Sequence, residues 1–142
     1  MSKMPHPFSL PAKLEPDLRR VHEYWAGLKR GENKIPFADD VNLSALSGLK
    51  ERVMLLDAFE QPQRFRVSSL GSEIRADYGA DIVDKFVDEI EGKGPLQFLN
   101  AQASATVEAC APTYHRNGFA RLLLPMWGDG HVALLLGAVV RA

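Results

Sequence analysis

The chain has 142 residues, of which 46% are hydrophobic and 25% are charged, and these proportions suit one globular domain with its own core. Its net charge of −1 excludes a strongly basic protein that binds nucleic acid or anionic membranes through its overall field. Its single cysteine, Cys110, excludes an internal disulfide and a zinc site built from several thiolates, which favours a reducing, cytoplasmic location.

Residues 1–13 carry three prolines and show no hydrophobic periodicity, which predicts a disordered leader. They contain no continuous apolar run of the length found in signal peptides. The longest apolar runs elsewhere are far below the roughly 18 residues needed to cross a bilayer, so no membrane segment is expected. The folded part is therefore predicted to be a single domain over residues 14–142.

An amphipathic helix is predicted over residues 15–30. Pro16 suits a first helical turn, Glu15 and Asp17 suit the positive end of the helix dipole, and Gly31 suits the position after the last turn. The apolar residues lie on one face and form what we call the helix stripe: Leu14, Leu18, Val21, Trp25 and Leu28. This stripe has to cover another apolar surface.

The remaining elements follow from periodicity and turn residues. Asn42 is expected to cap a short helix that carries Leu43, Leu46 and Leu49. Strands are predicted at 52–59, 64–70, 113–117, 119–127 and 131–141, and helices at 72–79, with Ser72 as the cap, at 81–90, and at 95–111, opened by Pro95. Because helices and strands do not alternate, the pattern predicts an α+β domain with an antiparallel sheet.

The last two strands have apolar residues on both of their faces. One face of residues 119–127 presents Ala120, Leu122, Leu124 and Met126, while the other includes Leu123 and Trp127. An antiparallel sheet with one side in water alternates apolar and polar residues, and this one does not. Both faces are therefore expected to be covered, one by the middle helices and the other by the helix stripe. The stripe could come from the same chain or from a partner chain, so a homodimer is expected.

Several stretches together resemble the short single-domain PAS (Per-ARNT-Sim) proteins of proteobacteria. They are HEYWAGLKRG around Trp25, IPFADDVNLSALSGL followed by RVMLLDAF, RFRVSSLGSEI, and the closing LLLPMWGDGHVALLLGAV. The resemblance covers about residues 14–141. The run Ala38-Asp39-Asp40 departs from the more basic, proline-containing run that this family often has, so no function is assigned to that loop.

The resemblance implies a five-stranded antiparallel sheet with short helices on one face and a hydrophobic cleft between them. It also implies a role in bacterial signal transduction, through a small hydrophobic ligand in the cleft or through a signalling protein partner. The helix stripe residues Leu18, Val21, Trp25 and Leu28 are the expected dimer or partner interface. Apolar residues expected to line the cleft are Phe86, Phe98, Leu99, Tyr114, Leu122 and Leu124, although core packing explains the same residues.

Motifs for catalysis, metals or cofactors are missing from the sequence. The four histidines have no helical i, i+4 pair, and there is no HExxH, CxxC, GxSxG, GxGxxG or P-loop. No histidine lies in the helices over 81–90 and 95–111 where a haem ligand would be expected, and Cys110 lies outside the Asn-Cys-Arg motif of flavin-binding relatives. We therefore expect no metal, no cofactor and no enzymatic activity.

Two other classes of function stay open. One is a small α+β enzyme with a hydrophobic pocket, such as an isomerase, for which Asp57 and His115 are the only suggestive acid or base. The other is a purely structural interaction domain whose core is filled.

Overall fold

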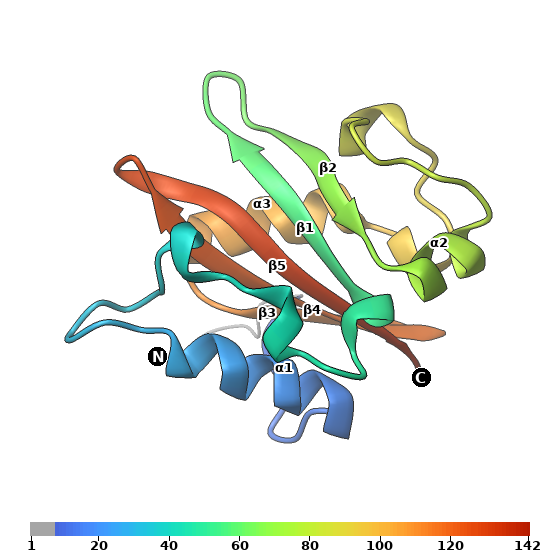
Figure 1. Ribbon diagram of the computed structural model, residues 1–142. Helices are drawn as coiled ribbons and strands as arrows, with labels where there is room; N and C mark the ends of the chain where they lie inside the picture. The colour runs from blue at the N-terminus through green and yellow to red at the C-terminus, as the bar shows by residue number, and fades with distance from the viewer. Residues whose placement is uncertain (1–7) are drawn as a thin grey trace, which may run out of the picture.

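The computed structural model describes residues 8–142, and residues 1–7 of the predicted leader lie outside the described part. Its centre is a five-stranded antiparallel sheet in the order β2-β1-β5-β4-β3. The strands are β1 (Val53–Phe59), β2 (Arg64–Leu70), β3 (Thr113–Asn117), β4 (Phe119–Gly128) and β5 (His131–Arg141). The helices are α1 (Pro16–Gly27), α2 (Ser72–Tyr78) and α3 (Leu99–Ala109), as Figure 1 shows. The predicted α+β class and antiparallel sheet are confirmed.

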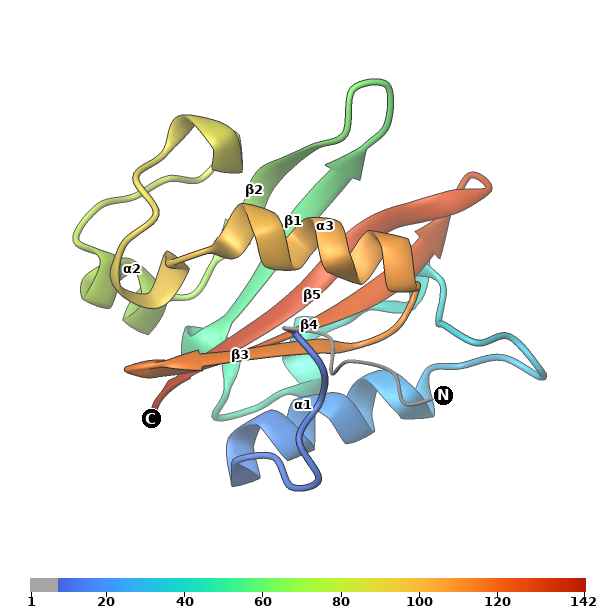
Figure 2. The same ribbon diagram turned by 180° about the vertical axis from the view of Figure 1, so that it is seen from behind.

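The sheet is covered on both faces. Helix α1 and the connector at 38–52 lie on one face, and α3 lies on the other, as Figures 1 and 2 show from opposite sides. The buried residues of β4 run without interruption from Ala120 to Met126. The expectation that both faces of the terminal hairpin are shielded is therefore confirmed.

The register of the strands assigns each residue to a face. Leu122 pairs with Ala138 and Leu124 with Leu136, and these residues face α1. Leu123 pairs with Gly137, and a Cβ on Gly137 would meet the side chains of Leu123 and Met54, so these residues share the face covered by α3. The α1 face and the α3 face are used below in this sense.

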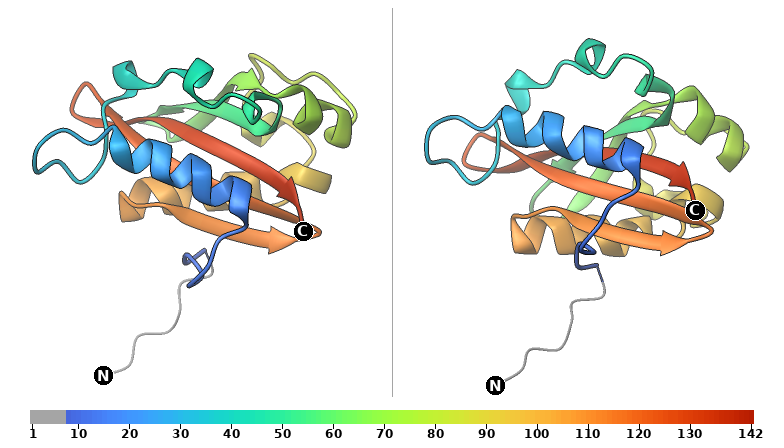
Figure 3. Two further views of the ribbon diagram at one scale, coloured as in Figure 1. Left: turned by 60° about the horizontal axis from the view of Figure 1, so that its bottom comes forward. Right: turned by 90° about the horizontal axis from the view of Figure 1, so that it is seen from below.

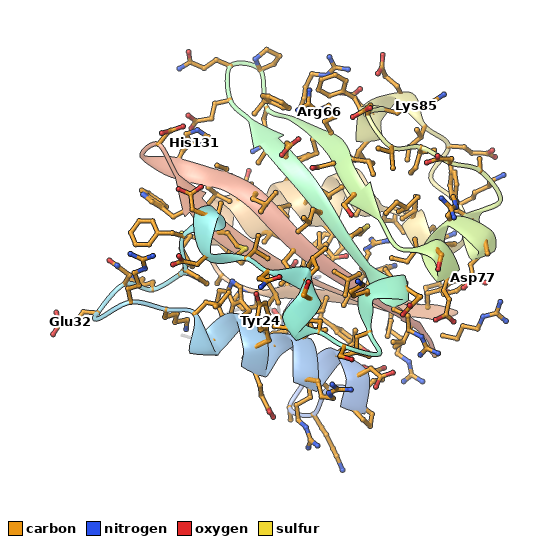
Figure 4. All side chains as sticks on the ribbon, in the orientation of Figure 1. Tyr24, Glu32, Arg66, Asp77, Lys85 and His131 are labelled. Atoms are coloured by element: carbon orange, nitrogen blue, oxygen red, sulfur yellow. The ribbon has the colours of Figure 1, made fainter. Side chains whose placement is uncertain are left out.

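Helix α1 lies on the sheet of its own chain. Leu18, Val21 and Trp25 are buried against it, and the views from below in Figure 3 show α1 lying over β4 and β5. Trp25 is 2% exposed, and its indole Nε1 donates a hydrogen bond of 2.8 Å to the carbonyl of Pro125. On the upper side of the helix, Tyr24 reaches the backbone of Asn42 through its hydroxyl (Figure 4).

The Trp25–Pro125 bond lies where β4 extends beyond β3. Strand β3 pairs only with residues 119–123, so the second half of β4 has no strand on that side. Pro125 has no N–H to leave unpaired, which is why proline is tolerated on such an edge. Its carbonyl is satisfied by Trp25, and the N–H of Trp127 donates to the carbonyl of Pro36 at 2.8 Å.

Two predicted helices differ from the structure. The predicted helix over 81–90 does not form, because Asp84 and Lys85 pair with the backbone of Val67 on the edge strand β2. Asp84 has a φ of +72°, which no helix can continue through. Ile82 and Val87 are still buried, but in an extended segment with one 3₁₀ turn at Val87–Glu89.

The helix predicted over 95–111 begins at Leu99. Pro95 lies instead in a 3₁₀ turn at Gly94–Leu96, and Phe98 follows in a left-handed conformation with a φ of +58°. Ser72 is the first residue of α2 and Gly71 occupies the capping position. A Cβ on Gly71 would lie 2.3 Å from the carbonyl oxygen of Glu51, so only glycine fits where β2 ends.

Replacing Trp25 by phenylalanine should destabilise the chain by about 2 kcal/mol, because the buried carbonyl of Pro125 loses its donor. Urea denaturation followed by circular dichroism measures this change in the free energy of unfolding. Trp127→Phe is the matched control, since Trp127 is 36% exposed and its side chain makes no hydrogen bond within residues 8–142. That variant should change stability by less than about 0.5 kcal/mol; equal losses in the two variants would refute the role of the indole N–H.

Candidate functional site

The six residues predicted to line a cleft do not lie together. Tyr114 pairs with Leu122 in the sheet, and both face α1 together with Leu124. Leu99 is buried on the opposite face of the sheet, and Phe98 is 57% exposed beside it. Phe86 lies at the edge of β2, where its ring packs against Phe59 and under the guanidinium of Arg64. The structure therefore does not bring these six residues together, because the register divides them between the two faces of the sheet.

Tyr114 belongs to the contact between β3 and α1. Its hydroxyl donates a hydrogen bond of 2.8 Å to the carboxylate of Glu15, the residue before α1. Burial, together with the adjacent Glu15 carboxylate, raises the pKa of Tyr114 to about 12. This pair fixes the start of α1 and contributes nothing to the α3 face.

The predicted interface residues are also accounted for within the chain. Leu18, Val21 and Trp25 are buried in the core and Leu28 packs against it. A homodimer would therefore have to use other side chains.

The acid and base of the enzyme alternative lie apart. Asp57 on β1 forms an ion pair of 2.9 Å with Arg66 on β2, whose side chain is labelled in Figure 4. Asp57 continues the face of Leu55, which pairs with Leu136 on the α1 face, whereas His115 pairs with Arg121 on the α3 face. Strands β5 and β4 separate β1 from β3, so these two residues cannot share one site.

The most unusual chemistry lies on the α3 face, around Arg121. This arginine is 2% exposed, and no carboxylate of residues 8–142 lies within 4.0 Å of its guanidinium. The nitrogens Nε, Nη1 and Nη2 donate instead to neutral oxygens of Gln102, Pro95 and Gln97, at 2.7, 2.9 and 2.8 Å. Burial lowers the pKa of Arg121 to about 9.

Hydrogen bonds connect four residues around Arg121: Arg121, Gln102, Thr106 and Thr113. Together with His115, the strand partner of Arg121, we call them the arginine centre. Gln102 Nε2 donates to the hydroxyl of Thr113 at 3.1 Å, and the hydroxyls of Thr106 and Thr113 are 2.6 Å apart. The two carbonyls held by Arg121 flank Leu96, which explains why this segment turns away from the predicted helix. The centre therefore fixes the segment that leads into α3.

His115 is the incomplete member of the arginine centre. Its Nε2 atom is buried and has no hydrogen-bond partner among residues 8–142. Its ring lies between those of Phe8 and Phe98, with centroid distances of 5.9 and 5.7 Å. Burial, and secondarily the charge of Arg121, lowers the pKa of His115 below 6.5.

The sequence reasoning missed Arg121 and Gln102 as site residues. A signal was present, since Arg121 is the only charged residue in a strand whose two faces were both expected to be buried. A buried charge without a charged partner is rare enough to need an explanation of its own.

A concave region lies at the edge of β4 beyond the end of β3. It is a cavity of about 230 Å³ lined by Asn33, Lys34, Ile35, Phe37, Cys110 and Trp127. It forms because the pairing of β3 with β4 extends only as far as Leu123, which leaves room beside Trp127 for the connector at 33–37. Cys110 ends α3 in a left-handed conformation at this cavity.

No group of three or more side chains suited to hold a metal ion occurs within residues 8–142. Over the same residues, no helix has the length and apolar character required to cross a bilayer. Comparison of the chain with protein-family models, with curated proteins and with solved structures found no match.

Lowering the pH below 6.5 should destabilise the chain through His115. Its pKa is lower in the folded chain than in the unfolded chain, so the unfolded chain binds more protons in this range and the unfolding free energy falls as the pH falls. An NMR titration of the His115 ring should give a midpoint below 6.5.

His115→Gln should reduce this pH dependence of stability, measured by urea denaturation between pH 7 and 5. His22, whose pKa is also lowered by burial, should keep its own contribution in that variant. A midpoint for His115 at or above 6.5 would contradict the buried, neutral state described here.

Proposed function

We propose that this chain is a PAS-like sensory or adaptor domain that acts in bacterial signal transduction in the cytoplasm and is not an enzyme. The observation that carries the proposal is the arrangement of the sheet. The sheet is built from two consecutive groups of strands, β1–β2 and β3–β5. The helical segments at 72–109 connect the two groups across the α3 face. A five-stranded antiparallel sheet with short helical segments on one face is what the PAS resemblance implies, and this arrangement supports the proposal.

The placement of the polar groups supports a sensing role. The arginine centre lies between α3 and the sheet, where a ligand cleft is expected in a PAS-like domain. Arg121 holds the carbonyls of Pro95 and Gln97, so the arginine centre is connected directly to the segment at 95–98. A molecule bound at the centre would therefore alter the contacts of this short covering segment rather than those of the sheet. This coupling of a buried site to a surface segment is what a sensor requires.

The open edge of β4 supports contact with a protein partner as the output of the domain. Trp127 and Phe37 line the cavity at this edge, and aromatic side chains that are partly exposed are common in protein interfaces. Leu18, Val21 and Trp25 are already buried, so the output surface proposed here is the β4 edge and not the helix stripe.

Native mass spectrometry of the freshly purified full chain tests the sensing role. We expect a fraction of the protein to carry a small molecule that is lost on denaturation. A spectrum that shows only the bare chain, together with no stabilisation by any member of a metabolite panel in thermal-shift assays, would favour a purely structural interaction domain.

Size-exclusion chromatography with light scattering tests the homodimer. If a dimer forms through the β4 edge, Trp127→Ala should shift it toward the monomer by at least tenfold in dissociation constant, as expected for an interface aromatic. Leu10→Ala is a control on an exposed apolar residue outside that edge. A strict monomer at high concentration would remove the dimer from the proposal and leave the sensing role in place.

A further inference from the structure

The arginine centre lacks a negative charge. Removing a guanidinium from water is unfavourable unless an anion or a full set of acceptors replaces the water. Arg121 has five N–H groups, and its three hydrogen bonds leave one N–H on Nη1 and one on Nη2 without an acceptor among residues 8–142. Two N–H groups on neighbouring nitrogens match the two oxygens of a carboxylate.

His115 adds an independent observation at the same place. It pairs directly with Arg121 in the sheet, so both side chains project from the α3 face. Its buried Nε2 atom lacks a partner in the described part of the chain, and a neutral imidazole can donate from this nitrogen to an anion. The two remaining N–H groups of Arg121 and the Nε2 atom of His115 thus all lack a hydrogen-bond acceptor among residues 8–142.

We propose that Arg121 and His115 form a binding site for a small monocarboxylate with an aromatic or other apolar body. This inference rests on the proposed sensing function and names its ligand class. The carboxylate accepts from the two free N–H groups of Arg121 and from His115 Nε2, while the body of the ligand lies against the rings of Phe8 and Phe98.

The charge of the site selects among anions. Arg121 supplies one positive charge, and burial lowers the pKa of His115, which favours the neutral imidazole. One negative charge compensates this site, whereas a second charge, as in the dianions of phosphate and sulfate, would be buried without compensation. The flanking rings favour an apolar body over a small hydrated ion for the same reason.

Phe98 is the cover that moves to admit the ligand. It is 57% exposed, and its φ of +58° is unfavourable for a non-glycine residue. Displacing its ring opens a route to His115 and leaves the three hydrogen bonds of Arg121 in place. Binding would therefore be read out as a change at the start of α3.

NMR of the ¹⁵N-labelled full chain at pH 7 and constant ionic strength tests the site. Sodium benzoate, sodium acetate and sodium phosphate are titrated separately, and the Arg121 Nε and His115 ring signals are followed. We expect saturable shifts of both signals, with benzoate binding at least tenfold more tightly than acetate and phosphate producing none. At a benzoate concentration ten times its dissociation constant, Tm should rise by about 5 °C.

Variants separate the site from general effects of salt. Arg121→Lys keeps the charge without the paired N–H groups and should weaken benzoate binding at least tenfold, and His115→Phe should weaken it several-fold. Arg116→Gln is the matched control, because Arg116 is the next residue along β3 on the opposite face and is 62% exposed. Its affinity for benzoate should be unchanged. If Arg121→Lys does not fold, the titration of the unmodified chain and of His115→Phe still decides.

Three outcomes would overturn the inference. The Arg121 and His115 signals could move no more than that of Arg116 with every anion, phosphate could bind as tightly as benzoate, or His115→Phe and Arg121→Lys could leave affinity unchanged. A neutral molecule retained in native mass spectra, with no response to carboxylates, would overturn this ligand class while leaving the proposed sensing function in place.

Discussion

The structure depends on one constraint: a β-hairpin, β4 and β5, whose two faces are both apolar and must both be kept from water. Helix α1 meets this requirement on one side and α3 with its preceding segment on the other. Burial of one large apolar side chain is worth about 1.5–3 kcal/mol, so neither cover is optional. The hydrogen bond from Trp25 to Pro125 then fixes the position of α1 on the sheet, because moving the helix would leave the buried carbonyl of Pro125 without a donor.

The same two-layer cover makes a polar centre possible inside a small domain. Arg121 is held far from water only because α3 and the segment at 95–98 close over the α3 face. Its hydrogen bonds to two backbone carbonyls in turn keep that segment out of helical geometry. Packing and polar chemistry therefore support each other here, and Arg121 is at once part of the fold and the proposed ligand group.

Much of the fold could be predicted from local signals. Short stretches of sequence predict the turns at Asn117-Gly118 and Asp129-Gly130, the strand over 64–70 and the apolar stripe of α1. The helix over 81–90 was wrong because its apolar spacing also suits a segment that pairs with the edge of β2, a long-range contact. The site was largely missed, since the face on which Tyr114 or His115 lies follows from strand register, and register depends on partners distant in sequence.

The mismatch in length between β3 and β4 has a consequence for association with other chains. An unpaired strand edge is a template on which a foreign strand can add, and aggregation often starts there. In this protein the half of β4 beyond β3 carries Pro125, which lacks the N–H that an added strand would need. The carbonyl of Pro125 already accepts from Trp25, and the N–H of Trp127 already donates to Pro36. The exposed end of the sheet thus accepts side-chain contacts but resists extension of the sheet into a fibre.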